Sequence, residues 1–230
     1  HEWSDFVHLE FPIRKLVKVH GIARFHLLEM GTKFRLYLSA VHIDPLKPVI
    51  PITYPKSFAR EIHSKIGDYP TLGWGIDTWA LDEHVTDEHV FEEDFEFTTG
   101  KFEQILEHFI GNPEDRLYAQ IFYFTDRAGH MFWRFMDKDN PAYDPALEPE
   151  WGDFVERSYI RMDQIVGKVL DRLPPDGLLL VCSDHGFSTW RRSFNMNTWL
   201  VQNGFMTLKG QVDGKHYNLD DLFGHGQFWP

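Results

Sequence analysis

Two pairs of acidic and imidazole side chains in this sequence have the composition of metal ligands. Asp126 and His130 are four residues apart, and Asp184 and His185 are adjacent. If Asp126 begins a helical turn, the spacing of the first pair places both side chains on one helix face. Carboxylate oxygens and imidazole nitrogens without any thiolate suit zinc, manganese or iron. The sequence therefore predicts divalent metal binding at both pairs.

Each pair follows an apolar segment that has the length and composition of a buried strand. The first segment is Leu117–Phe124 and the second is Leu178–Cys182. The residues between them include Asp153–Leu173, whose apolar positions recur at helical spacing up to Pro174. Strand, helix and strand predict a βαβ unit with parallel strands in one sheet. Because ligands bind at the carboxyl ends of such strands, we expect the two pairs to converge.

Less specific interpretations exist for these residues. An Asp-x-x-x-His spacing is common, and an Asp-His pair after a strand also occurs as a helix N-cap beside a surface histidine. Two pairs at corresponding strand ends favour the metal interpretation. Arg127 and Arg134 flank the first pair and could contact substrate oxygens, but we expect structural ion pairs for both.

Longer motifs around the pairs resemble a known family. Residues Thr125–Arg134 and Ser183–Ser188 closely resemble the type I phosphodiesterase and nucleotide pyrophosphatase branch of the alkaline phosphatase superfamily. The resemblance continues through Asp139–Asp144 and Ser193–Leu200 and is specific over Leu117–Leu208. It implies an α/β fold with an alkaline-phosphatase-like α/β/α core.

The resemblance also implies two metal ions at the carboxyl ends of the central strands. Asp126 and His130 match ligands of one ion, and Asp184 and His185 match ligands of the other. Zinc is the metal we expect first, with manganese or iron as alternatives. The implied activity is hydrolysis of phosphate esters, either phosphodiesters or nucleotide pyrophosphates. A sulfatase or a phosphomutase of the same superfamily remains an alternative, because metal ligands alone do not separate these activities.

Two parts of the family pattern have no counterpart here. One is an early Asp followed by the Thr or Ser nucleophile, and the other is a late histidine. His225 is a conceivable substitute ligand, although its neighbours do not match the family. We therefore expect an internal fragment whose nucleophile lies outside this chain. A non-catalytic binding or regulatory domain derived from the same fold is the alternative.

Size, composition and net charge limit the classes of binding partner that we expect. The 230 residues are 43% hydrophobic, enough for one large domain or two small ones. A net charge of −12 disfavours nucleic-acid polymers and anionic membranes as partners. The charge remains compatible with a small phosphorylated substrate, because bound metal ions invert the local field.

Cys182 is the single cysteine, so no intrachain disulfide forms. The cysteine content therefore does not indicate in which cellular compartment the protein works. No apolar run is long enough to span a bilayer, and the oligomeric state is left open.

Three segments are expected along the chain. Residues 1–44 read as an antiparallel β segment, 45–113 as a helical cap or insertion, and 114–230 as the part of the α/β core that carries the motifs. Within the second segment, Ser57 and Gly67 delimit a helix over Phe58–Ile66. The same segment holds a cluster of six acidic and imidazole residues, for which we favour a solvated helical face over a second metal site. Its members are Asp82, Glu83, His84, Asp87, Glu88 and His89.

Overall fold

The computed structural model describes residues 3–14, 17–72, 75–112, 115–189 and 194–207. The chain divides into two compact units, His1–Thr189 and Trp190–Pro230. The sequence predicts a short helix over Asn197–Asn203 that ends at Gly204, and the described part of the second unit contains the helix α7 (Met196–Gln202), after which Gly204 has a positive φ.

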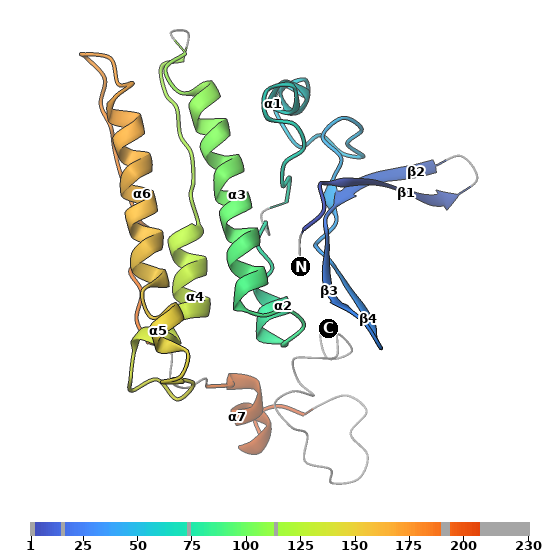
Figure 1. The fold of residues 1–230 in the computed structure, drawn as a ribbon, viewed down its shortest axis with the longest axis vertical. Helices are drawn as coiled ribbons and strands as arrows, with labels where there is room; N and C mark the ends of the chain where they lie inside the picture. Colours follow the sequence, from blue (N-terminus) through green and yellow to red (C-terminus); the bar gives the residue numbers. More distant parts are fainter. Residues whose placement is uncertain (1–2, 15–16, 73–74, 113–114, 190–193, 208–230) are drawn as a thin grey trace. The chain divides into compact units, whose positions relative to one another are not determined.

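The amino-terminal segment forms two small antiparallel sheets (Figure 1). Their strands are β1 (Val7–Arg14), β2 (Val17–Ala23) and β5 (His42–Ile43) in the order β1-β2-β5, and β3 (Phe25–Met30) paired with β4 (Phe34–Leu38). The antiparallel prediction is confirmed. Gly21 is a point of close approach within β2, because a Cβ atom there would lie 2.6 Å from Val41 Cγ1 and 3.0 Å from the His42 carbonyl oxygen.

Helices make up most of the remaining first unit. They are α1 (Phe58–Ile66), α2 (Thr78–Asp82), α3 (Glu88–Phe109), α4 (Phe124–Met136), α5 (Glu148–Trp151) and α6 (Phe154–Leu170). The predicted helix at Phe58–Ile66 is confirmed, and Gly67 follows it with φ of 70°. The amphipathic segment before Pro174 is confirmed as α6. None of the helices in the described ranges is long and apolar enough to cross a membrane.

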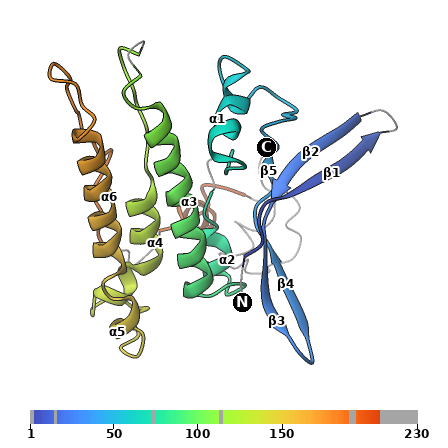
Figure 2. The ribbon, with the colours of Figure 1, turned by 45° about the horizontal axis from the view of Figure 1, so that its top comes forward.

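An aromatic core joins α3, α4 and α6, which run side by side in Figures 1 and 2. The rings of Phe132 and Phe154 stack with centroids 3.9 Å apart, and Phe95 contacts Phe154 edge-on at 5.2 Å. All three side chains are at least 98% buried. Burial of each such ring contributes roughly 2–3 kcal/mol relative to exposure. This core fixes one face of α4 and leaves the opposite face accessible.

The predicted parallel strands are not formed. Every strand among the described residues lies between Val7 and Ile43, and α4 already begins at Phe124. Leu117–Tyr123 and Leu178–Cys182 run extended, with Leu117 83% and Leu180 75% exposed. A strand needs neighbours that complete its backbone hydrogen bonds, and neither segment belongs to a sheet formed by the described residues. The fold in the described ranges is therefore mixed α/β with small antiparallel sheets.

One further strand prediction also fails. The sequence of Phe205–Leu208 predicts a strand after α7, but residues 205–207 form none, and Leu208 lies outside the described residues. Gly204 ends the helix before it with φ of 76°.

Candidate metal centre

Helix α4 carries the first pair on its accessible face. Asp126 lies in the first turn, and its Oδ1 atom is 3.4 Å from Nε2 of His130, one turn later. The side chains are 31% and 50% exposed. A carboxylate in the first turn also interacts favourably with the helix dipole. The one-face arrangement predicted from the spacing is confirmed.

Hydrogen bonds within the segment Ser183–Gly186 orient the second pair. Ser183 Oγ donates to the His185 carbonyl oxygen over 2.6 Å, and His185 Nδ1 lies 2.8 Å from the Gly186 carbonyl oxygen. Because a carbonyl oxygen only accepts, Nδ1 carries the proton, and Nε2 of the neutral ring keeps its lone pair. The hydrogen bond to Gly186 and then the charge of Asp184 raise the pKa of His185.

The two pairs meet at Asp126. His185 Nε2 lies 3.9 Å from Asp126 Oδ1 and 3.7 Å from Asp184 Oδ2, while Asp184 itself is 88% exposed. Asp126 is thus flanked by an imidazole from its own helix and by another from the segment after α6. The convergence expected at a sheet edge arises although the expected strands do not form, because α4 and the segment 183–189 pack directly.

The donor chemistry of these four residues fits a divalent ion. Tetrahedral zinc with bonds of about 2.0–2.1 Å holds neighbouring ligand atoms roughly 3.3 Å apart. The separation of 3.4 Å in the first pair agrees with that value, and the separations around His185 are wider. No set of three His, Cys, Asp or Glu residues in the described ranges is arranged to hold an ion. Each pair therefore offers two ligands. His225 lies outside the described residues.

Four residues that the metal hypothesis did not include fasten the second pair to α4. They are Gly129, Trp133, Phe187 and Thr189, and they contact one another across the two segments. A glycine inside a helix lowers helix stability by about 1 kcal/mol relative to alanine, so a glycine there often marks a position where another segment packs closely. Gly129 was therefore a visible sequence signal that another segment approaches α4 at this position.

The arginines beside the first pair differ in role. Arg134 donates to Glu88 Oε1 over 2.6 Å and lies over the Phe135 ring at 4.5 Å. The ion pair expected for Arg134 is confirmed. The Arg127 guanidinium lies 5.7 Å from the centroid of the Tyr123 ring.

The acidic and imidazole cluster before α3 has structural roles. Asp87 caps α3, with its Oδ1 atom accepting from the Val90 amide over 3.0 Å. Glu88 pairs with Arg134, and His89 lies 3.3 Å from Glu150. The remaining members, Asp82, Glu83 and His84, are exposed. The exposure of five of the six members agrees with a solvated face, whereas Glu88 is partly buried in its ion pair with Arg134.

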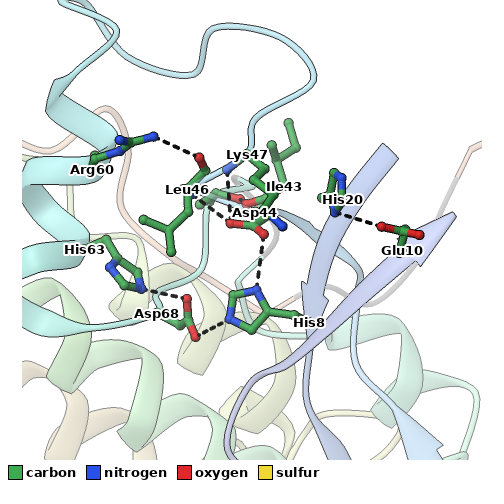
Figure 3. Close-up of polar contacts among 11 residues, drawn as sticks. His8, Glu10, His20, Ile43, Asp44, Leu46, Lys47, Arg60, His63 and Asp68 are labelled. Atoms are coloured by element: carbon green, nitrogen blue, oxygen red, sulfur yellow. Dashed lines mark hydrogen bonds and ion pairs between the residues drawn. The ribbon is translucent and has the colours of Figure 1, made fainter. Parts of the chain in front are cut away.

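A second polar cluster escaped sequence reasoning (Figure 3). His8 on β1 places Nδ1 3.2 Å from Asp44 Oδ2 and Nε2 3.1 Å from Asp68 Oδ2. His63 of α1 shares Asp68, at 3.2 Å from its other oxygen. Ionised carboxylates only accept, so both His8 nitrogens donate when both contacts form. Burial alone would lower the pKa of His8, but the bond to Asp44 and the charge of Asp68 raise it.

Comparison with known proteins identifies one match. The family model described as type I phosphodiesterase / nucleotide pyrophosphatase matches residues 18–224. No curated protein and no solved structure matches the chain. The matched range covers most of the chain and includes both Asp–His pairs.

Proposed function

The chain belongs to the type I phosphodiesterase / nucleotide pyrophosphatase family, and from this premise we propose that it carries part of the active centre of a metal-dependent phosphodiesterase or nucleotide pyrophosphatase. The observation that supports this proposal most strongly is the position of Asp126 between His130 and His185. The two motifs that resemble the family are thereby adjacent in space as well as characteristic in sequence.

Each pair has a separate role in the proposal. Asp126 and His130 bind one ion, and Asp184 and His185 bind the other. Zinc suits this set of oxygen and nitrogen donors best, and manganese or iron are compatible with it. Two such ions supply Lewis-acid stabilisation of the charge that develops on the phosphoryl oxygens. The Gly186 carbonyl supports the assignment of His185, because it keeps the Nε2 lone pair available for a ligand bond.

The proposed active centre needs groups beyond these pairs. We place the attacking Thr or Ser, which forms a covalent phosphoryl-enzyme in this family, and the remaining ligands outside the chain. In a complete alkaline-phosphatase-like core, Leu117–Tyr123 and Leu178–Cys182 would be paired strands. Their exposed apolar side chains, such as Ile121 and Leu178 at 80% each, support that proposal.

The test is hydrolysis of bis(4-nitrophenyl) phosphate by the full-length protein with added Zn²⁺. We expect turnover that a chelator abolishes, and a loss of at least about 100-fold in kcat/KM for His130→Ala and for Asp184→Asn. His89→Ala is the matched control, since this exposed histidine contacts Glu150 and the edge of the Trp151 ring, neither of which belongs to the two Asp–His pairs, and it should retain activity.

Two outcomes would favour the other functions. Chelator-sensitive turnover of 4-nitrophenyl sulfate without turnover of the diester would identify a sulfatase. Full-length protein that hydrolyses neither ester with Zn²⁺, Mn²⁺ or Fe²⁺ would support the binding or regulatory domain. Turnover that is insensitive to chelator would contradict the metal assignment itself.

A further inference from the structure

Gly129 is the point at which the segment after α6 touches α4. It is buried in the helix interior, and a Cβ atom at this position would lie 2.9 Å from Phe187 Cδ2 and 3.0 Å from its Cε2 and Cγ. Carbon atoms in favourable contact are about 3.5–4.0 Å apart. Only glycine therefore allows the Phe187 ring to lie against the helix in this position.

The Phe187 ring bridges the two ligand motifs. It meets the His130 ring edge-on at a centroid distance of 5.1 Å and the Trp133 ring at 5.2 Å. These are ordinary distances for attractive aromatic contacts. Phe187 thus contacts a proposed ligand of the first pair, while it lies two residues after His185 of the second.

Hydrogen bonds hold the next residues of the segment on the same helix. Trp133 Nε1 donates to Thr189 Oγ1 over 2.9 Å, and Thr189 Oγ1 in turn donates to the carboxylate of Asp137 at the end of α4. The segment is consequently attached to α4 at Phe187 and again at Thr189. The position of His185 relative to Asp126 depends on these attachments, because His185 makes no other close contact with α4 among its described polar contacts.

We propose that Gly129 and Phe187 are positioning residues for the metal centre. Because Gly129 has no side chain, the Phe187 ring packs directly on α4, and this contact sets the distance from His185 to Asp126. This inference rests on the proposed function. An added methyl group at position 129 would displace the ring by roughly 1 Å before ordinary contact is restored. A displacement of this size would move His185 relative to Asp126 and so change the spacing between the two ions that the pairs are proposed to hold, which is about 3.5–4 Å in two-metal sites.

The experiment is a calorimetric Zn²⁺ titration of the full-length protein as a double-mutant cycle. Gly129→Ala should weaken Zn²⁺ binding about 10- to 100-fold, the range typical of residues that orient ligands. In the Phe187→Ala background the same substitution should change affinity less than about threefold, because the ring that it displaces is gone. Gly167→Ala is the matched control, since Gly167 also lies in a helix but has nothing within 4 Å of its added Cβ.

The outcomes separate the two proposals. Full-length protein that binds no Zn²⁺, or that loses no affinity with His130→Ala, contradicts the proposed function and this inference with it. Loss of affinity with His130→Ala but not with Gly129→Ala contradicts the positioning role alone. Equal losses for Gly129→Ala in both backgrounds also contradict it, because the effect would not pass through Phe187.

A folding defect would not prevent the test. Phe187→Leu leaves the sequence of α4 unchanged and replaces only the bridging ring with a smaller aliphatic side chain. If circular dichroism shows Gly129→Ala to be unfolded, Phe187→Leu and Phe187→Ala should still weaken Zn²⁺ binding progressively, while circular dichroism shows that both variants remain folded. Unchanged affinity in both would overturn the inference.

Discussion

Oδ1 of Asp126 and Nε2 of His185 lie 3.9 Å apart, although one belongs to the first turn of α4 and the other to an extended segment beyond α6. The contact depends on α4 and on the packing of residues 183–189 against it. It does not depend on the parallel strands that would precede each motif in an alkaline-phosphatase-like core. In this structure the packing of residues 183–189 on α4 brings the two motifs together without paired strands before them.

Acid should destabilise the protein through His42. This side chain is 97% buried, and its Nδ1 accepts hydrogen bonds from the amides of Thr71 and Leu72 at 3.2 Å each. Burial lowers the pKa of His42 to about 4. The unfolded chain therefore takes up more protons below pH 6.5, and stability present above that pH is lost as the pH falls toward 4. We expect a loss of roughly 2 kcal/mol at pH 5 from this group.

Urea unfolding at pH 7 and pH 5 measures this effect. His42→Gln has no group that titrates in this range, so its free energy of unfolding should change less between the two pH values than that of the wild type. Equal pH dependence in the two proteins would show that His42 is not buried in its neutral form.

His8 should contribute with the opposite sign. Its pKa is raised above the usual value by Asp44 and Asp68, against the effect of burial. The stabilisation from this charged cluster is therefore complete below pH 6.5 and is lost as the pH rises through the raised pKa. Figure 3 shows that the cluster joins His8 of β1 to Asp44 and Asp68, which precede and follow α1 in the sequence. Weaker amide protection of β1 at higher pH is the expected consequence.

Proton NMR titration of the His8 ring tests this assignment. We expect a pKa above 6.5 in the wild type and a lower one in Asp44→Asn, which removes one of the two acceptors. His20→Gln is a suitable control, because the His20 side chain faces Glu10, and its contact with Asp44 is through the backbone carbonyl, which the substitution keeps. A His8 pKa at or below 6.5 would be inconsistent with the double hydrogen bond.

Among the acidic residues of α3 that pair with basic residues of α6, Glu103 should contribute most to the free energy of unfolding. Its carboxylate is 89% buried and pairs with both Arg161 and Lys168, the latter at 2.9 Å. Glu103→Gln should lower the free energy of unfolding by about 1–3 kcal/mol, since two partly buried cations lose their charged acceptor. Glu107→Gln removes a more exposed partner of Lys168, at 2.9 Å, and should cost about 0–1 kcal/mol. Chemical denaturation of both variants makes the comparison, and equal costs would contradict the ranking.

The helices were predictable because the information that specifies them is local. The apolar spacing of α6, the boundary residues of α1 and the Asp126–His130 spacing in α4 each depend on a few neighbouring positions. Pairing of Leu117–Tyr123 or Leu178–Cys182 depends on partner strands, and an apolar run carries no information about its partner. The contact of His8 with Asp68 was equally inaccessible, because no motif links residues so far apart. Gly129 lies between these cases, since its position inside a helix was visible but its partner Phe187 was not.

Anomalous diffraction at the zinc absorption edge tests the metal centre most directly. Crystals of the full-length protein grown with Zn²⁺ should show two anomalous peaks roughly 3.5–4 Å apart. One should lie about 2.0–2.2 Å from ligand atoms of Asp126 and His130, and the other at the same distance from Asp184 and His185. Peaks that occur only elsewhere, for example between His8 and His63, or the absence of any peak at these four side chains, would contradict the proposed metal centre.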